Sequence, residues 1–272
     1  MRLIIQKDYV CVSRWTAAYL AKQVTSFQPG PKKPFVLGLP TGSSPVGTYR
    51  ELVRLCQAGL LSFKNIITFN MDEYVGLPRD HPQSYFTFMR RHLFDHVDLP
   101  PENIHVLDCN APDLEQECRA YEDKMAEYDG VRLFLGGIGP DGHIAFNEPG
   151  SSLGSRTRIK TLNEDTIIAN SRFFDGDSSK VPQTALTVGV ATVMDAREVV
   201  LIVSGHSKAR ALRMVVEEGV NHMWTVSALQ MHPKGMIVCD EDACAELRLE
   251  TFNYFRRIER ACLDPDTLFP TD

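Results

Sequence analysis

Three side chains that can move protons lie within eight residues of one another. Asp141, His143 and Glu148 follow an apolar run that ends at Leu135. An imidazole accepts and donates protons near neutral pH, and a neighbouring carboxylate can orient it. The same trio could bind zinc or manganese, or His143 could be a structural histidine. No second histidine or cysteine follows at a metal-ligand spacing, so the pattern favours proton transfer without a metal.

The glycines around these residues formally match a dinucleotide-binding motif. Residues 137–142 fit the pattern G-x-G-x-x-G. That motif requires a helix directly after the loop, and Pro140, Asn147 and Pro149 oppose one. The carboxylate of Asp141 would also repel a pyrophosphate. The glycines therefore indicate a loop shaped around a ligand, and we expect no cofactor.

A further pair of carboxylates, Asp72 and Glu73, follows the apolar run at residues 65–69. Neighbouring side chains in an extended strand point to opposite faces, so only one of the two can face a site. A single carboxylate there would suit proton abstraction from carbon beside a carbonyl group. A loop-capping aspartate or a solvated pair is the alternative interpretation.

The segment at residues 40–45 joins an apolar run to a helical pattern. It holds Gly42, Ser43 and Ser44, and free amides at a helix start bind anions such as phosphate. An ordinary turn with a serine cap is the alternative, because no Walker lysine follows. Arg172 and Lys208 are cations that could complete such a site or remain solvated. A lysine at a helix start opposes the helix dipole unless it faces an anion, as Lys208 would.

Six short apolar runs with segments of helical spacing between them must position these groups. The runs are residues 34–39, 65–69, 104–107, 131–135, 198–203 and 235–239. Alternating strands and helices predict right-handed crossovers and a doubly wound α/β fold, a Rossmann-like three-layer sandwich with a mainly parallel sheet and helices on both faces. We expect one catalytic domain over residues 1–272, with the functional groups on the loops after strands.

Composition narrows the possible partners. The chain has a formal charge of −6 and a pI of about 5.8, which offers no basic surface for nucleic acid but leaves small sugar phosphates possible. Its seven cysteines are scattered, without a Cys-x-x-Cys pair, as in a reduced cytoplasmic protein. No apolar run is long enough for a membrane span or an export signal, so we expect no membrane partner and a cytoplasmic location.

Five segments in order resemble the glucosamine-6-phosphate deaminase family, and the likeness covers essentially the whole chain. They are LPTGSSP at 39–45, FNMDEY at 69–74, GPDGHIAFNEP at 139–149, SRTRIKT at 155–161 and NHMWT at 221–225. The resemblance implies conversion of glucosamine 6-phosphate and water into fructose 6-phosphate and ammonium, without metal or nucleotide. Asp72 would move the proton between C2 and C1 through an enolamine. His143, supported by Asp141 and Glu148, would open the pyranose ring.

The resemblance also assigns binding residues. Phosphate would lie against Gly42, Ser43, Ser44, Arg172 and Lys208. Family members are often hexamers activated by N-acetylglucosamine 6-phosphate at a subunit interface, which implies a homo-oligomer and an effector site here. The matching residues are Ser151, Ser152, Arg158, Lys160, Thr161 and Tyr254. Arg158 and Lys160 could equally lie on a solvated strand edge.

Other features of the family comparison concern segments of the chain. Residues 163–181 correspond to a mobile lid, which Gly176, Ser178 and Ser179 would permit. Ser43-Ser44 stands where many bacterial members have Gly-Thr, which keeps a hydroxyl but alters the phosphate contact. The tail at residues 260–272 matches no pattern.

Two other functions fit the same general pattern. A 6-phosphogluconolactonase-like hydrolase would share the fold and the phosphate site, but the Asp72 segment and the full set of proton-transfer groups favour the deaminase. A non-catalytic sugar-phosphate sensor would need a basic helix-turn-helix, and the chain has no room for one before its first strand.

Overall fold

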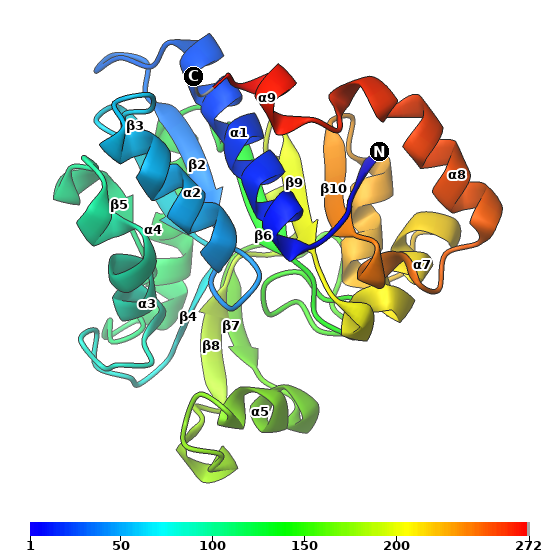
Figure 1. The fold of residues 1–272 in the computed structure, drawn as a ribbon. Coiled ribbons are helices and arrows are strands. Elements are labelled where there is room, and N and C mark those ends of the chain that lie inside the picture. Colours follow the sequence, from blue (N-terminus) through cyan, green and yellow to red (C-terminus); the bar gives the residue numbers. More distant parts are fainter. Residues whose placement is uncertain (271–272) are drawn as a thin grey trace.

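The computed structural model describes residues 1–270 and confirms the predicted doubly wound α/β fold (Figure 1). Its main sheet has seven parallel strands in the order β1-β10-β9-β6-β2-β3-β5. The strands are β1 (Arg2–Gln6), β2 (Phe35–Leu39), β3 (Ile66–Asn70), β5 (Ile104–His105), β6 (Leu133–Gly137), β9 (Val199–Val203) and β10 (Gly235–Asp240). All six predicted runs became strands of this sheet.

Nine α-helices connect and cover the strands within the described residues. They are α1 (Tyr9–Phe27), α2 (Val46–Gln57), α3 (Tyr85–His92), α4 (Leu114–Glu127), α5 (Glu164–Ser171), α6 (Val190–Met194), α7 (Ala209–Glu217), α8 (Leu249–Ile258) and α9 (Pro265–Leu268). Side-chain caps fix several starts: Asp8 accepts from the amide of Cys11, and Asp113 accepts from that of Gln116. No helix in this part of the chain is long and apolar enough to cross a bilayer.

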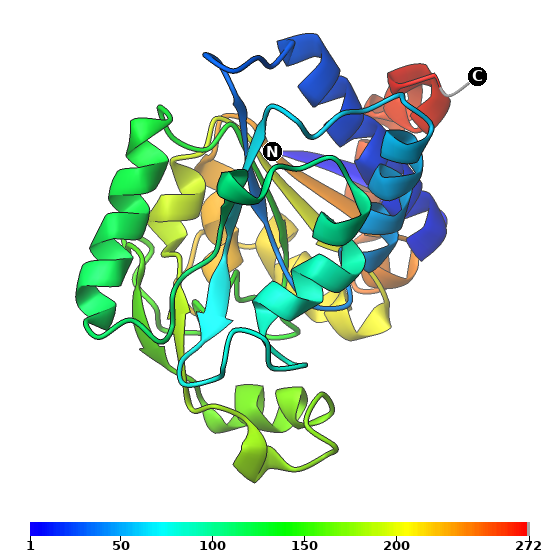
Figure 2. The ribbon, with the colours of Figure 1, turned by 90° about the vertical axis from the view of Figure 1, so that its left-hand side faces the viewer.

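Alternate side chains of the strands build two separate cores. One core packs α1, α2 and α3 against one face of the sheet through residues such as Leu37 and Ile202. The other packs α4, α6 and α7 against the opposite face through residues such as Phe134 and Leu201. Figure 2 shows the sheet nearly edge-on, with α1 and α2 on one side and α4 on the other. Burial on both faces explains why the strand sequences are continuously apolar.

A second, antiparallel sheet was missed in the sequence. It has the order β4-β8-β7 and consists of β4 (Asp72–Tyr74), β8 (Thr184–Thr187) and β7 (Arg158–Thr161). Its strands have only three or four residues and carry many polar side chains, so the sequence contains no apolar run from which they could be predicted. Figures 1 and 2 show this sheet, with α5, projecting from the edge of the main sheet where the parallel strands end.

The apolar side chains at residues 86, 89, 93, 94 and 97 follow a helical spacing, but α3 ends at His92. Leu93 leaves helical geometry at φ −143° and ψ −60°, and a single 3₁₀ turn, η1 (Phe94–His96), follows. Leu93 is fully buried and Phe94 nearly so. The break allows both side chains to enter the core next to α2.

The C-terminal segment, whose role the sequence left open, packs against the start of the chain. The indole of Trp15 donates to the carbonyl of Cys262, and Gln6 donates to that of Leu263. Arg2 forms a bidentate ion pair with Glu259. This segment therefore stabilises α1 and the sheet edge at β1.

Candidate active site

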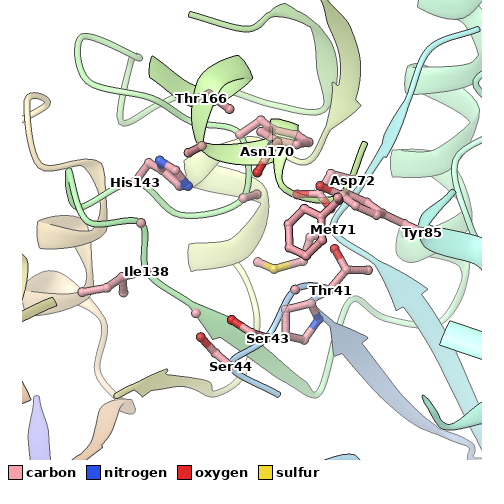
Figure 3. A pocket seen from close by; sticks show the side chains of 18 of the residues that line it. Thr41, Ser43, Ser44, Met71, Asp72, Tyr85, Ile138, His143, Thr166 and Asn170 are labelled. Carbon is pink, nitrogen blue, oxygen red and sulfur yellow. The ribbon is translucent and has the colours of Figure 1, made fainter. Parts of the chain in front are cut away.

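A cavity of about 740 Å³ opens at the carboxyl ends of β2 and β6. The chain adds β3 and β5 on one side of β2 but β6, β9 and β10 on the other, so the strand order reverses there. The loops after β2 and β6 consequently diverge and leave a crevice, as in other open α/β sheets. Figure 3 shows side chains from these loops, from β4 and from α5 converging on the cavity.

Asp72 faces the cavity and Glu73 turns away from it, as strand alternation predicted. Asp72 begins β4 and is only 7% exposed. Burial, with a smaller contribution from the charge of Glu73, raises the pKa of Asp72 to about 8. Glu73 accepts from the amides of Tyr74, Tyr85 and Phe86 and thereby caps α3. One carboxylate is thus placed for chemistry and its neighbour for structure.

His143 lies across the cavity from Asp72 (Figure 3). Its Nδ1 is 2.7 Å from Oδ1 of Asp141. Burial would raise the pKa of Asp141, but its interaction with His143 outweighs this and the net pKa is lowered. Asp141 is therefore an ionised carboxylate placed where it can orient the ring of His143.

The glycines of this loop provide room for the histidine and its neighbours. A Cβ on Gly139 would lie 2.4 Å from the ring of His143, and one on Gly142 would lie 2.4 Å from the indole of Trp224. Gly142 also has a φ of +74°, which favours glycine. Gly139 and Gly142 of the G-x-G-x-x-G pattern are thus required because His143 and Trp224 pack directly against the backbone of this loop.

Glu148 does not line the cavity with the other three proton-transfer residues. It is 3% exposed, and its carboxylate accepts from the amide of Asn163 and the hydroxyl of Thr166 at the start of α5. The ammonium of Lys160 on β7 lies 3.5 Å away. Glu148 therefore connects β7 to the segment at residues 163–181, while Asp141 is the carboxylate beside His143.

The loop after β2 forms the floor of the cavity in Figure 3, where Ser43 and Ser44 face inward. Gly42 has a φ of +89° and a Cβ there would meet no neighbour, so its backbone conformation is what requires glycine. The hydroxyl of Tyr9 donates to the carbonyl of Ser43 and accepts from the amide of Gly47. This tyrosine, which the sequence did not single out, ties the loop to the start of α2.

Arg172 and Lys208 come from distant parts of the chain and line the same cavity as Ser43 and Ser44. Arg172 follows α5, and Lys208 closes η4 (His206–Lys208), a 3₁₀ turn after β9. Burial, opposed by the charge of Asp141 and assisted by that of Arg172, lowers the pKa of Lys208 to about 8. Burying a lysine beside an arginine becomes energetically favourable when an anion binds between the two side chains.

Five of the six residues matched to an effector site lie on or before β7. Ser151 is buried with its hydroxyl unpartnered among the described residues, and Arg158 donates to the side chain of Asn147. Tyr254 lies on α8 and is half exposed. Figure 1 shows α8 well apart from β7, so one copy of the chain does not bring all six together.

Several residues that line the cavity were given no role in the sequence analysis. Tyr74 accepts a hydrogen bond from Asn170 of α5, and its ring packs against Tyr85 and Phe146. Tyr74 therefore joins the second sheet to α5 through its hydroxyl and to α3 through its ring. The remaining unpredicted lining residues include Thr41, Met71, Ile138, Thr166 and Trp224. Across residues 1–270, no group of three or more histidine, cysteine, aspartate or glutamate side chains is placed to hold a metal ion.

Comparisons with known proteins agree with this arrangement. Residues 11–238 match the family described as glucosamine-6-phosphate isomerases/6-phosphogluconolactonase. A protein of Parabacteroides distasonis named glucosamine-6-phosphate deaminase is 62% identical over 268 residues, covering 98% of this chain and 99% of the relative. One of the same name from Porphyromonas gingivalis W83 is 63% identical over 260 residues, covering 96% of this chain and 99% of the relative.

Solved structures give the same result. One, described as a monomeric glucosamine-6-phosphate deaminase, is 41% identical with a TM-score of 0.84 and covers 91% of this chain and 100% of its own. A 6-phosphogluconolactonase from Trypanosoma cruzi has a TM-score of 0.71 at 19% identity, covers 90% of this chain and 96% of its own, and shows the shared fold. The chain belongs to the glucosamine-6-phosphate isomerase/6-phosphogluconolactonase family and, within it, to the glucosamine-6-phosphate deaminases.

Proposed function

We propose that this enzyme converts glucosamine 6-phosphate and water into fructose 6-phosphate and ammonium. The observation that carries the proposal is a single cavity in which buried Asp72 faces the His143–Asp141 pair above a loop suited to phosphate. The names of relatives above 60% identity support the same substrate. The reaction belongs to amino-sugar catabolism and suits the cytoplasm, where seven free thiols stay reduced.

The reaction begins with ring opening. His143, held by Asp141, moves the proton of the C1 hydroxyl to the ring oxygen, which leaves an aldehyde at C1. Asp72 then removes the proton from C2, and His143 passes a proton from the C2 ammonium to the C1 oxygen, so that an enolamine forms. Asp72 then returns its proton to C1 and leaves an imine at C2. Water hydrolyses the imine, which releases ammonium and forms the ketone.

The raised pKa of Asp72 suits this role. A carboxylate with a pKa of about 8 is a stronger base toward carbon than an exposed one. The substrate's ammonium group, placed beside Asp72, would favour the ionised carboxylate. Asp72 could then act as a base at neutral pH.

The phosphate would be bound by Gly42, Ser43 and Ser44 on one side and by Arg172 and Lys208 on the other. All five residues line the cavity, and the two cations supply the charge that a dianion needs. This binding would fix C1 and C2 between Asp72 and His143.

Residues 163–181 would act as a lid within a single catalytic domain. This segment contributes Thr166, Asn170, Arg172 and Phe174 to the cavity wall, and its α5 projects from the body of the protein. Its contacts with Glu148 and Tyr74 would hold it over the substrate. Glu148 would support His143 when the lid contacts rearrange.

N-acetylglucosamine 6-phosphate would activate the enzyme at Ser151, Ser152, Arg158, Lys160, Thr161 and Tyr254. The separation of α8 from β7 within one chain supports a site shared between copies of a homo-oligomer, with a hexamer as the proposed state. A sigmoidal substrate curve that becomes hyperbolic with the effector would support the site, whereas effector-independent kinetics would contradict it.

A direct assay tests the reaction. The purified protein is mixed with glucosamine 6-phosphate, without metal or nucleotide, and ammonium and fructose 6-phosphate are measured together. Equal amounts of both products are expected, with none from Asp72→Asn. Hydrolysis of 6-phosphogluconolactone with no deamination, even in the presence of N-acetylglucosamine 6-phosphate, would instead favour the lactonase function.

A further inference from the structure

A buried carboxylate outside the cavity holds the turn that carries Lys208. Asp240 is the last residue of β10 and is 4% exposed. It lies beside the end of β9, because Cys239 pairs with Val203 in the parallel ladder. The cavity lining does not include Asp240, but it includes Lys208, five residues beyond Val203. The two residues therefore belong to neighbouring strand ends, one at the site and one behind it.

The contacts of Asp240 concentrate on the start of this turn. The amide of Gly205 donates to both carboxylate oxygens, at 2.9 and 3.1 Å, and the hydroxyl of Ser204 donates to Oδ2. The amide of Ala243, in the neighbouring 3₁₀ turn η6 (Asp242–Cys244), donates to Oδ1 at 2.9 Å. Where β9 ends, hydrogen bonds to the Asp240 side chain thus follow the strand-to-strand backbone hydrogen bonds. They join the turn at Ser204–Lys208 to η6, and these two turns pack against each other.

The backbone at Gly205 explains why such support is needed. Gly205 has φ 87° and ψ 153°, a conformation that is essentially restricted to glycine. Its carbonyl then accepts from the amide of Lys208 at 3.0 Å, which closes the turn. The conformation of one residue therefore sets the direction in which the Lys208 side chain leaves the main chain.

We propose that Asp240 is a positioning residue, which holds the Ser204–Lys208 turn so that the Lys208 ammonium meets the substrate's phosphate. This inference rests on the proposed function. Asp240 acts through main-chain geometry: its hydrogen-bond donors are the neutral groups of Ser204, Gly205 and Ala243.

This mechanism makes different substitutions distinguishable. In Asp240→Asn, the amide oxygen can accept from Gly205 and Ala243, while the amide nitrogen can donate to the hydroxyl of Ser204. The asparagine should therefore preserve the turn although it removes the charge. Asp240→Ala removes every acceptor and leaves buried donors unpaired, so the turn should shift.

Steady-state kinetics and phosphate binding test the proposal together. Asp240→Ala should raise the KM for glucosamine 6-phosphate and weaken calorimetric binding of inorganic phosphate, each about tenfold, with kcat within about twofold of wild type. The phosphate lies away from the reacting carbons, so its contact is equal in ground and transition states. Asp240→Asn should stay within about threefold of wild type in both measurements, with an unchanged pH profile.

A control separates positioning from general loss of stability. Asp98, an exposed carboxylate, also ties a loop, through Ser62 and the amide of Phe63, but it does so before β3, on the other side of β2 and β6 from β9. Asp98→Ala should lower the melting temperature and leave KM unchanged. If Asp240→Ala does not fold, Gly205→Ala disturbs the same turn and should raise KM in the same way.

Each remaining outcome is decisive. A folded Asp240→Ala protein with wild-type KM and phosphate affinity would overturn the inference. So would Asp240→Asn kinetics as poor as those of the alanine variant, because the charge would then act directly. A wild-type protein without deaminase activity would refute the proposed function alone, since the phosphate calorimetry of the same variants still tests the positioning role.

Discussion

At the scale of single residues, the site depends on where each carboxylate is buried. Asp72 is buried without a hydrogen-bonding partner that would favour its charge, and its pKa is raised to about 8. Glu73, one residue later, receives three backbone amides. The chain thus places a desolvated carboxylate, Asp72, at the cavity and a fully hydrogen-bonded one, Glu73, on the opposite face of the strand. Burying Asp72 in this way lowers the stability of the fold.

That cost predicts how stability depends on pH. Between about pH 4 and pH 8 the native state keeps a proton on Asp72 that the unfolded chain releases, so this residue lowers the free energy of unfolding as pH rises. Asp72→Asn should therefore stabilise the protein, by a small amount at pH 5 and by a few kcal/mol at pH 8. Chemical denaturation at both pH values measures the difference.

The control for this prediction is Asp123→Asn, which changes an exposed aspartate of α4. It should leave the denaturation curves at both pH values unchanged. An Asp72→Asn protein no more stable at pH 8 than at pH 5, relative to wild type, would mean that the carboxylate is not desolvated.

The sequence predicted residue types better than their contacts. Asp72, His143 and Lys208 line one cavity, as their positions after strands indicated. Glu148 is close to His143 in sequence, but its carboxylate contacts α5 and β7, because the intervening residues 144–147 turn back in a short bridge. A sequence motif does not reveal such a turn.

At the scale of elements, the alternation of apolar runs and helical spacing was enough to predict the main sheet. Each long strand is buried on both faces, so its composition is distinctive. The small sheet β4-β8-β7 was not predictable in this way, because its strands are short and its pairing is tertiary. The role of Tyr9 was equally unpredictable from the sequence. Its hydroxyl reaches Ser43 and Gly47 only because α1 packs against α2.

The bridge made by Tyr9 predicts a binding effect. Tyr9→Phe keeps the ring but removes the hydroxyl that joins the carbonyl of Ser43 to the amide of Gly47. The phosphate loop should become less ordered, with KM for glucosamine 6-phosphate about threefold higher and kcat unchanged. Steady-state kinetics on both proteins measures the effect.

Tyr128→Phe is the matched comparison for that experiment. Tyr128 closes α4 on the other face of the sheet, and its hydroxyl makes no hydrogen bond with the described residues. This variant should behave as wild type. If Tyr9→Phe does so too, the loop after β2 holds its shape without the tyrosine.

At the scale of the whole molecule, the proposed effector site requires more than one copy of the chain. Tyr254 is half exposed on α8, while Ser151 and Lys160 lie near the second sheet. The solved relative described as monomeric shows that this fold also exists as a single copy. Assembly, and not the fold alone, should therefore determine whether the enzyme is regulated.

Light scattering and kinetics at the same concentrations test this dependence. Where the protein is oligomeric, N-acetylglucosamine 6-phosphate should reduce the substrate concentration at half-maximal rate. At dilutions where only monomers remain, it should have no effect. A monomer that still responds would place the entire effector site within one chain.

The pairing of β1 with β10 also has a consequence for synthesis. Within residues 1–270, Arg2–Gln6 pairs only with Gly235–Asp240, so β1 leaves the ribosome more than two hundred residues before β10 exists. Until then its apolar side chains and unpaired amides stay available to other nascent chains. Parallel pairing over such a separation is slow, because the loop must close before any contact forms. We therefore expect chaperones to hold the nascent chain until its last strand arrives, and fragments truncated before β10 to aggregate.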